Sequence, residues 1–173
     1  MDSAFIITFI GDDRPGLVEE LSAVITEQGG NWRESRLQQL GGKFAGLVSV
    51  TLPGDNGTEL RNALKALAPR GLSVKVTALD SLQDRSGGRT IRLAIVGPDR
   101  PGIVREISAA LAQQHINVVD MHSDVGSAPM SAEAIFSANV EAQIAEQTDL
   151  DELHDRLEDI ANQMLVDVHL ETD

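Results

Sequence analysis

The sequence predicts an α+β protein built from two ferredoxin-like domains, each with its elements in the order βαββαβ. Residues 11–18, Gly-Asp-Asp-Arg-Pro-Gly-Leu-Val, return as residues 97–104, Gly-Pro-Asp-Arg-Pro-Gly-Ile-Val. When residues 11–31 are aligned with residues 97–117, 11 of the 21 positions are identical. Each copy follows an apolar run of strand character and precedes apolar residues at helical spacing. A repeat with a spacing of 86 residues indicates a small domain copied once.

Local signals predict each element of the first half. Residues 4–10 alternate between two apolar faces, which is typical of a buried strand. Pro15 suits the first position of a helix that ends at the Gly29-Gly30 pair. Gly41-Gly42 indicates a hairpin. The other elements expected here are strands over residues 31–40, 43–52 and 72–79, and a helix that Thr58 caps.

The second half repeats this order after a polar segment. Residues 81–89 are expected to be a linker, which leaves one domain over residues 1–80 and another over residues 90–173. Ala134-Ile135-Phe136-Ser137 resembles Gly46-Leu47-Val48-Ser49, so the preceding turn is expected to be two residues longer than its counterpart. Right-handed crossovers place both helices on one face of a four-stranded antiparallel sheet. Because the other face stays open, we expect the halves to associate with each other or with a partner.

The composition argues against several classes of function. The chain has 173 residues, no cysteine and a net charge of −13. This charge opposes direct binding to nucleic acid, whose affinity comes largely from Lys and Arg at phosphates. No apolar run is long enough for a membrane span, and Met1-Asp2-Ser3-Ala4 lacks the basic region of a signal peptide. We therefore expect a cytoplasmic protein that binds neither nucleic acid nor membranes.

Signatures of catalysis and of metal binding are missing from the sequence. It contains no P-loop, no dinucleotide-binding glycine motif, no nucleophile elbow and no His-Glu-x-x-His. Asp120, His122 and Asp124 alternate on one strand face, and such clusters can bind metals. The corresponding residues of the first half are Glu34, Arg36 and Gln38. A solvated polar face is the favoured interpretation, so we expect a non-catalytic protein without a metal or a cofactor.

The repeated motif resembles the signature loop of the ACT domain. Each half places Asp-Arg-Pro-Gly between a strand and an apolar helix that is followed by Asn, within a ferredoxin-like unit. Two such units, together with residues 31–36 (Asn-Trp-Arg-Glu-Ser-Arg) and 40–46 (Leu-Gly-Gly-Lys-Phe-Ala-Gly), are similar to the glycine cleavage system transcriptional repressor group. The resemblance implies binding of a small amino acid and regulation of enzymes or transcription. It also implies a homodimer that forms side by side, with residues 32–40 and 118–125 as the relevant segments.

The two Asp-Arg-Pro-Gly turns are the candidate ligand sites. A helix N-terminus exposes backbone N–H groups that suit a ligand carboxylate, while Gly16 and Gly102 allow close approach to the backbone. The alternative that these residues only begin a helix stays open. So does binding of one ligand by both halves, because His115-Ile116 replaces Gly29-Gly30. With the resemblance, the predicted ligand-binding residues are Asp12, Asp13, Arg14, Pro15, Gly16, Leu17, Val18, Asn31, Asp99, Arg100, Pro101, Gly102, Ile103, Val104 and Asn117.

Three functions remain open at this point. The first is a regulatory protein that senses a small amino acid, with glycine or serine as the first candidates, and acts by contacting another protein such as a transcription factor. The second is a regulatory subunit that controls an enzyme of amino-acid metabolism. The third is an assembly module with vestigial ligand sites. Retention of the turn in both halves favours a ligand-binding function, because a pure scaffold would not require it.

Overall fold

In a computed structural model the chain divides into two compact units, Met1–Asp84 and Arg85–Asp173. The structure describes residues 2–54, 56–79, 88–127 and 133–172. Most of the linker expected over residues 81–89 lies outside these ranges, and Arg89 is already part of a strand. Each unit is described by itself below. Among the described residues, no helix has the length and apolar character needed to cross a membrane.

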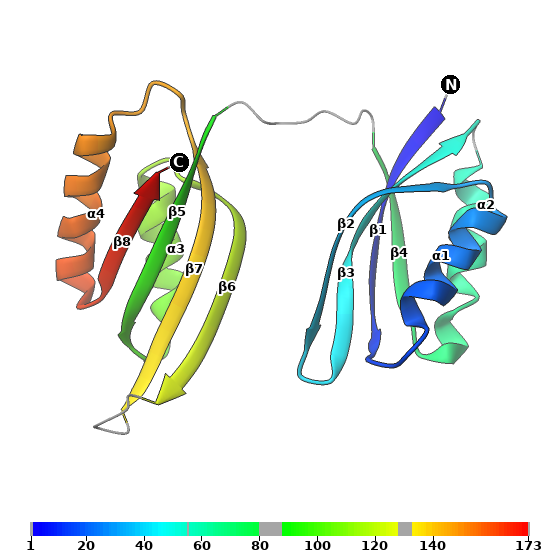
Figure 1. The fold of residues 1–173 in the computed structure, drawn as a ribbon, viewed down its shortest axis with the longest axis horizontal. Helices are drawn as coiled ribbons and strands as arrows, with labels where there is room; N and C mark the ends of the chain where they lie inside the picture. Colours follow the sequence, from blue (N-terminus) through cyan, green and yellow to red (C-terminus); the bar gives the residue numbers. More distant parts are fainter. Residues whose placement is uncertain (1, 55, 80–87, 128–132, 173) are drawn as a thin grey trace. The chain divides into compact units, whose positions relative to one another are not determined.

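The first unit is a four-stranded antiparallel sheet with two α-helices (Figure 1). Its strands lie in the order β2-β3-β1-β4, so β1 and β3 occupy the centre and the other two strands form the edges. β1 pairs antiparallel with both β3 and β4. In chain order the elements are β1 (Asp2–Asp12), α1 (Leu17–Glu27), β2 (Asn31–Leu40), β3 (Lys43–Pro53), α2 (Gly57–Lys65), the short 3-10 helix η1 (Ala68–Arg70) and β4 (Ser73–Leu79).

The second unit repeats the same topology. Its sheet has the order β6-β7-β5-β8, and β5 pairs antiparallel with β7 and β8. The elements are β5 (Arg89–Pro98), α3 (Ile103–Gln113), β6 (Asn117–Ser127), β7 (Ala134–Ile144), α4 (Leu150–Met164) and β8 (Asp167–Thr172). The predicted fold class, α+β with two βαββαβ units, is confirmed.

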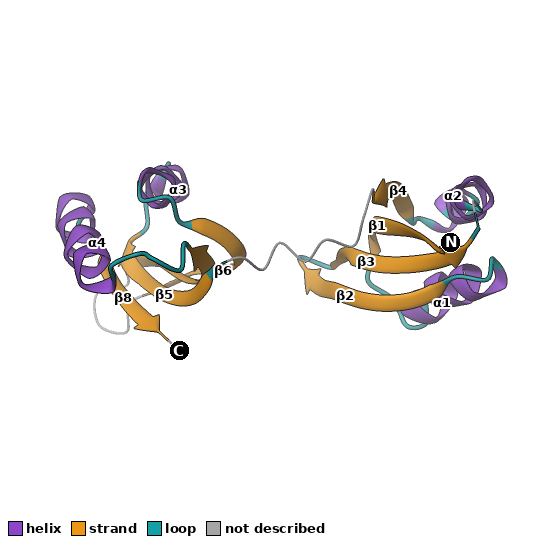
Figure 2. Cartoon of the chain, turned by 90° about the horizontal axis from the view of Figure 1, so that it is seen from above, coloured by secondary structure: helices purple, strands orange, loops and turns teal. Residues whose placement is uncertain are grey.

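The two helices of each unit cover one face of its sheet (Figure 2). The alternation in β1 sends one set of apolar side chains into a cluster that also contains side chains of α1 and α2. That cluster includes Phe5, Ile7, Phe9, Leu17, Leu21, Ile25, Leu60 and Leu64. The second unit builds the same cluster from β5, α3 and α4, with Ile91, Leu93, Ile95, Ile103, Ile107, Leu111, Leu153 and Leu157.

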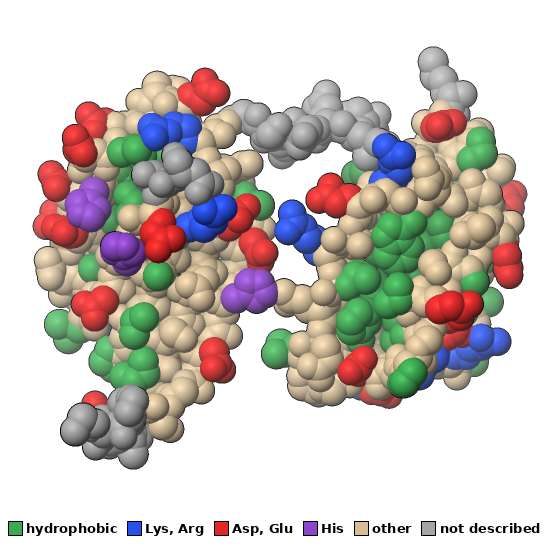
Figure 3. All heavy atoms as spheres, in the orientation of Figure 1, with side chains coloured by type: hydrophobic (Ala, Val, Ile, Leu, Met, Phe, Trp, Pro, Cys, Tyr) green, Lys and Arg blue, Asp and Glu red, His purple; other side chains and the backbone are tan. Residues whose placement is uncertain are grey.

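The uncovered faces of the two sheets differ in polarity. On the first sheet, Ile10 and Leu47 are each 49% exposed. The strand registers put Asn139 of the second unit at the place that Leu47 occupies in the first. Figure 3 shows apolar side chains gathered over strands of the first unit, and acidic side chains and histidines on the visible face of the second. The two copies have therefore diverged on the surface that their helices leave open.

The expected length of the turn between β6 and β7 is wrong. Phe44 lies opposite Gly11, and Phe136, 92 residues later in the chain, lies opposite Gly97. Up to β6 the two units keep the spacing of 86 residues, since Asn31 and Asn117 occupy the same register position. The turn is therefore six residues longer than its counterpart, not two, and Phe136 corresponds to Phe44 and not to Val48.

Candidate functional site

The repeated motif forms a tight turn that leads into the first helix of each unit. In the second unit the N–H of Ile103 donates to the carbonyl of Arg100 at 3.2 Å, and Gly102 has φ 89° and ψ −1°. These angles belong to the third residue of a type II turn, in which proline is common at the second position. Gly16 has nearly the same conformation, with φ 83° and ψ −1°. Both copies of the motif are thus Pro-Gly turns placed directly before a helix.

Helix α1 begins at Leu17, so the prediction that Pro15 is the first helical residue is wrong. The left-handed Gly16 separates the proline from the helix, because a residue with positive φ cannot continue a right-handed turn. The glycine is instead the residue that caps the helix. Its carbonyl accepts from the N–H of Glu20 at 2.9 Å. The N–H groups of the first helical turn, which the helix itself leaves without partners, face the loop.

The two glycines of each motif have different roles. A Cβ added to Gly11 would lie 3.0 Å from the carbonyl oxygen of Gly71, and one added to Gly97 would lie 2.6 Å from Cγ1 of Val166. These first glycines allow the strand to approach the chain that precedes the last strand of its sheet. A Cβ on Gly16 or on Gly102 would meet nothing within 4 Å. The second glycine is therefore required by its backbone conformation and not by crowding.

The arginine of each turn pairs with a glutamate six residues later, on the first helix. Arg100 donates from both terminal nitrogens to the two carboxylate oxygens of Glu106, each at 2.7 Å. In the first unit Arg14 pairs with Glu20, and Arg70 of η1 pairs with the other oxygen of the same carboxylate. Hydrogen bonds from these guanidinium groups lower the pKa of both glutamates and raise the pKa of Arg100.

Second contacts of the two arginines show how the units differ. Arg100 also donates to the backbone carbonyl of Met164, at 3.4 Å. Gly71 and Leu165 both adopt positive φ before the last strand, which places Met164 at the position that Arg70 holds in the first unit. At this position before the last strand, the first unit therefore has a second guanidinium that pairs with the glutamate, and the second unit has a backbone carbonyl that accepts from the arginine.

The aspartates of the motif lie at the end of the first strand. Asp12 pairs with Lys43, and the hydrogen bond from that ammonium group lowers the pKa of the Asp12 carboxyl. In the second unit the paired strand positions are Pro98 and Ile135, so this ion pair belongs to the first unit alone. Asp13 and Asp99, the aspartates that follow, hold the loop in place through backbone hydrogen bonds. The N–H of Asp13 donates to Gly42 at 3.0 Å, and the N–H of Asp99 donates to Ala134 at 2.9 Å.

A cavity of about 270 Å³ lies beside the turn of the first unit. The lining residues that the sequence predicts as ligand-binding are Asp13, Arg14, Gly16, Leu17 and Val18. Glu19 and Phe44 complete the lining and are not among the predicted residues. Phe44 reaches the site because β3 pairs with β1 and brings Phe44 opposite Gly11. The Gly41-Gly42 hairpin signal is the sequence feature that could have located it, since Phe44 is the second residue after this glycine pair.

Other predicted residues take different positions. Leu17 and Ile103 are only 3% exposed, so their side chains belong to the cores, whereas Val18 and Val104 are 40% and 43% exposed. Asp99 and Pro101 are exposed in the second turn. Asn31 and Asn117 begin the edge strands β2 and β6. Asn31 pairs with Thr51, which lies eight residues along β3 from Lys43, and Lys43 is beside the turn. Asn31 is therefore about 27 Å from the turn.

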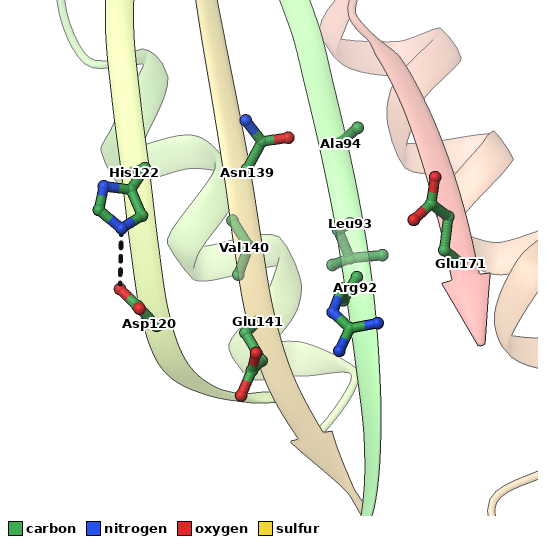
Figure 4. A pocket seen from close by; sticks show the side chains of 9 residues that line it. All are labelled: Arg92, Leu93, Ala94, Asp120, His122, Asn139, Val140, Glu141 and Glu171. Carbon is green, nitrogen blue, oxygen red and sulfur yellow. Dashed lines mark ion pairs between the residues drawn. The ribbon is translucent and has the colours of Figure 1, made fainter. Parts of the chain in front are cut away.

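The second sheet carries a separate depression of about 220 Å³ on its open face (Figure 4). Ala94 lies in its lining among longer polar side chains that include Arg92, Glu141 and Glu171. Nε2 of His122 lies 3.8 Å from Oδ1 of Asp120, and both side chains are roughly half exposed. Within the described residues, no group of three His, Cys, Asp or Glu side chains is arranged to hold a metal ion.

Together these features define a class of protein: a tandem of two ferredoxin-like domains, each with the same Pro-Gly turn before its first helix. Comparison with protein families makes the assignment specific. ACT domain profiles match residues 3–78 and residues 91–158. The chain belongs to the ACT domain family, and two ACT domains in tandem account for both of its units. It is an ACT-domain regulatory protein.

Solved structures share the tandem arrangement. A protein from Galdieria sulphuraria, described only as an unknown protein, is 26% identical, with a TM-score of 0.85 over 100% of this chain and 99% of that chain. A protein described as a proposed glycine cleavage system transcriptional repressor is 19% identical, with a TM-score of 0.78 over 100% of this chain and 98% of that chain. A search of curated proteins finds no match.

Proposed function

We propose that this protein senses a small amino acid at the turn of its first unit and passes that signal to another protein by direct contact. The observation that carries the proposal is the cavity of about 270 Å³ formed by the Asp13–Val18 segment and Phe44 at the start of α1. The proposed role is regulatory and non-catalytic, in keeping with the ACT domains of both units.

The chemistry of the turn suits a zwitterion. A ligand carboxylate would accept from N–H groups of the first turn of α1, where the helix dipole also favours a negative charge. Asp13 lines the same cavity, and its carboxylate would receive the ammonium group. Arg14 already pairs with Glu20, so it has a smaller part in anion binding than its position in the motif suggests.

Glycine and serine are the first ligands to test. The choice comes from the tandem likeness to the proposed glycine cleavage repressor, which supports a link to that metabolism. Val18 and Phe44 give the cavity apolar walls. They fit a ligand with a small side chain. We further propose that the output is control of transcription through a protein partner, and that the chain acts as a homodimer.

A ligand screen with two matched variants tests the site. Thermal shift with each of the twenty amino acids identifies the ligand, and calorimetric titration then compares Val18→Trp with Val104→Trp. Both valines are exposed at equivalent positions of α1 and α3, so an indole would block the cavity without disturbing the glycine. We expect Val18→Trp to abolish binding and Val104→Trp to leave one site intact. Unchanged binding in both folded variants would refute the site, and no response to any amino acid would favour the assembly module.

The proposed partner supplies the contact with DNA. A net charge of −13 gives the chain no electrostatic affinity for phosphates. The purified protein alone should therefore give no sequence-specific complex in a gel-shift assay near physiological salt. A nanomolar complex that survives competitor DNA would contradict this assignment. Recovery of a metabolic enzyme as the specific partner would instead support the regulatory-subunit function.

A further inference from the structure

Phe44, the aromatic wall of the proposed ligand cavity, has a counterpart in the second unit that lies inside the core. Phe44 is opposite Gly11 in the pairing of β3 with β1. Phe136 is opposite Gly97, so the two rings hold the same place in their sheets. Phe44 is half-buried and lines the cavity beside the turn, whereas Phe136 is only 3% exposed and belongs to the core of its unit. The same side chain is therefore presented to a ligand in one copy and buried in the other.

The residue that contacts the Phe44 ring differs between the two units. The ring centroids of Phe9 and Phe44 lie 5.9 Å apart with 38° between the ring planes, which is a tilted aromatic contact. Phe9 is 4% exposed, so its ring already fills the core next to Phe44. The second unit has Ile95 at this position, two residues before the glycine that faces the ring. Because isoleucine is smaller than phenylalanine and interiors are close-packed, Ile95 leaves room that Phe136 can fill.

A second difference at the same corner has the same direction. The chain before the last strand packs against the glycine that faces each ring. A Cβ on Gly11 would lie 3.0 Å from Cδ1 of Leu72, and the shorter side chain of Val166 holds this place in the second unit. The opposite change is small, since Ala138 has only one methyl group more than Gly46 at the next pair of strand positions. The first unit therefore has more side-chain volume around its aromatic wall.

We propose that Phe9 holds the ring of Phe44 at the cavity and thereby sets the size of the amino acid that the first unit accepts. The core has space for one aromatic ring at this corner, and Phe9 occupies it, so Phe44 stays at the surface and narrows the cavity. Phe9 is not among the residues that line the cavity, which makes it a positioning residue. The selection of ligands rests on the proposed function, whereas the placement of the ring does not.

A smaller residue at position 9 should change which ligands bind. With isoleucine there, Phe44 would turn into the core, as Phe136 does in the second unit. The cavity would lose an apolar wall and gain volume, so a small ligand would make fewer contacts and a longer side chain would fit. A single methylene group in an apolar pocket changes the preference between ligands by about tenfold or more, so the effect is measurable.

The test compares Phe9→Ile with Phe5→Ile. Both phenylalanines are 4% exposed and lie on the same face of β1, so the two variants remove the same buried volume. Phe5 lies about 13 Å along the strand from Phe9, beside Gly57 at the start of α2. Calorimetric titration with glycine, serine and leucine measures the selectivity. We expect Phe9→Ile to weaken glycine and serine binding by at least about fivefold and to raise the leucine-to-glycine affinity ratio by at least about tenfold. Phe5→Ile should keep both within about twofold.

Fluorine NMR locates the ring without any ligand. The chain has four phenylalanines, so protein labelled with fluorophenylalanine gives four signals, and Phe44→Leu identifies the signal of Phe44. A soluble gadolinium chelate should broaden the Phe44 signal of the wild type more than the Phe136 signal. In Phe9→Ile the Phe44 signal should become about as protected as that of Phe136. In Phe5→Ile it should stay as exposed as in the wild type.

Circular dichroism verifies the fold of each variant, and Phe9→Leu replaces Phe9→Ile if the latter is unfolded. A Phe44 signal that stays exposed in the folded variant would overturn the proposal. So would equal selectivity in Phe9→Ile and Phe5→Ile, or an equal loss for glycine and leucine. If the wild type binds no amino acid, the proposed function fails and the selection of ligands fails with it. The fluorine measurement still decides whether Phe9 positions the ring.

Discussion

Replacing Gly16 by alanine should destabilise the first unit through backbone strain alone. Gly16 has φ 83°, and a Cβ built on it would meet no atom within 4 Å. The alanine methyl group therefore makes no steric clash with the rest of the protein. The whole cost comes from holding an L-residue in the left-handed region, which is about 1–2 kcal/mol.

This cost translates into a measurable shift of the unfolding midpoint. With a urea slope of about 1–3 kcal/mol per molar for a small protein, the midpoint should fall by roughly 0.3–2 M. Trp32 is the only tryptophan of the chain and packs against the core of the first unit, so its fluorescence reports on this unit. Gly16→Asn should recover part of the loss, because asparagine tolerates the left-handed conformation better than alanine.

Two outcomes would refute this reasoning. An unchanged midpoint for Gly16→Ala would mean that the turn does not hold positive φ in solution. Equal losses for alanine and asparagine would mean that the cost is not conformational. Gly126→Ala is the control, since a Cβ on Gly126 also meets nothing within 4 Å and its φ lies outside the left-handed region. Because Gly126 belongs to β6 of the second unit, its effect is measured by amide exchange in that unit and not by Trp32 fluorescence. This variant should stay within about 0.5 kcal/mol of the wild type.

Three further predictions follow from the contacts. Guanidinium pairing lowers the pKa of Glu20, so the ionised carboxylate stabilises the folded state above its usual pKa of 4.5, and this contribution is lost as the pH falls through the folded value. Between about pH 6 and pH 3 the free energy of unfolding in urea should therefore decline less for Glu20→Gln than for the wild type. Parallel curves for the two proteins would contradict this. Gly46→Ala would place a Cβ 2.4 Å from the carbonyl oxygen of Arg36, so hydrogen exchange should show β2 loosened from β3, and native protection would count against the close approach. Leu64→Ala and Leu157→Ala each empty a buried leucine site and should cost about 2–5 kcal/mol in their own units; unit-resolved exchange that shows less than about 1 kcal/mol in either would argue against these cores.

The repeat carried most of the fold prediction. Two copies of the same motif, each between a strand pattern and a helix pattern, restrict the topology to a small domain used twice. Right-handed crossovers then fix the face on which the helices lie. The antiparallel sheets with central β1 and β5 agree with that expectation. Domain boundaries are less accessible to such reasoning, because polar residues at a linker resemble those of any exposed turn.

The error in the turn before β7 has a simple physical origin. The alignment of Phe136 with Val48 and the observed alignment with Phe44 differ by four residues. Side chains in a strand alternate with a period of two, so an even shift leaves every residue on the same face of the sheet. Hydrophobic pattern cannot distinguish the two alignments. Only the pairing of Gly97 with Phe136, which depends on contacts across the sheet, resolves them.

The sequence contains a signal that locates the start of the helix correctly. Pro-Gly is the residue pair that a type II turn favours at its two central positions. Reading Pro15 as the first helical residue followed an equally valid preference, because proline is common there as well. The two rules compete locally, and the conformation of Gly16 decides between them. Phe44 and Arg70 could not be assigned to the site from the motif, because contacts between distant parts of the chain bring them there. Phe44 lies beside the turn because β3 pairs with β1, and Arg70 through its ion pair with Glu20.

The pairs Arg14–Glu20 and Arg100–Glu106 change the interpretation of the motif itself. Both members of the pair are among the positions that remain identical between two copies that have diverged elsewhere. An arginine kept for a ligand carboxylate would not need a glutamate kept six residues later. A ligand anion at Arg14 would have to compete with a carboxylate that is covalently tethered and already in place. The arginine therefore holds the turn against the helix, and under the proposed function an amino acid would be recognised by the backbone N–H groups and by Asp13.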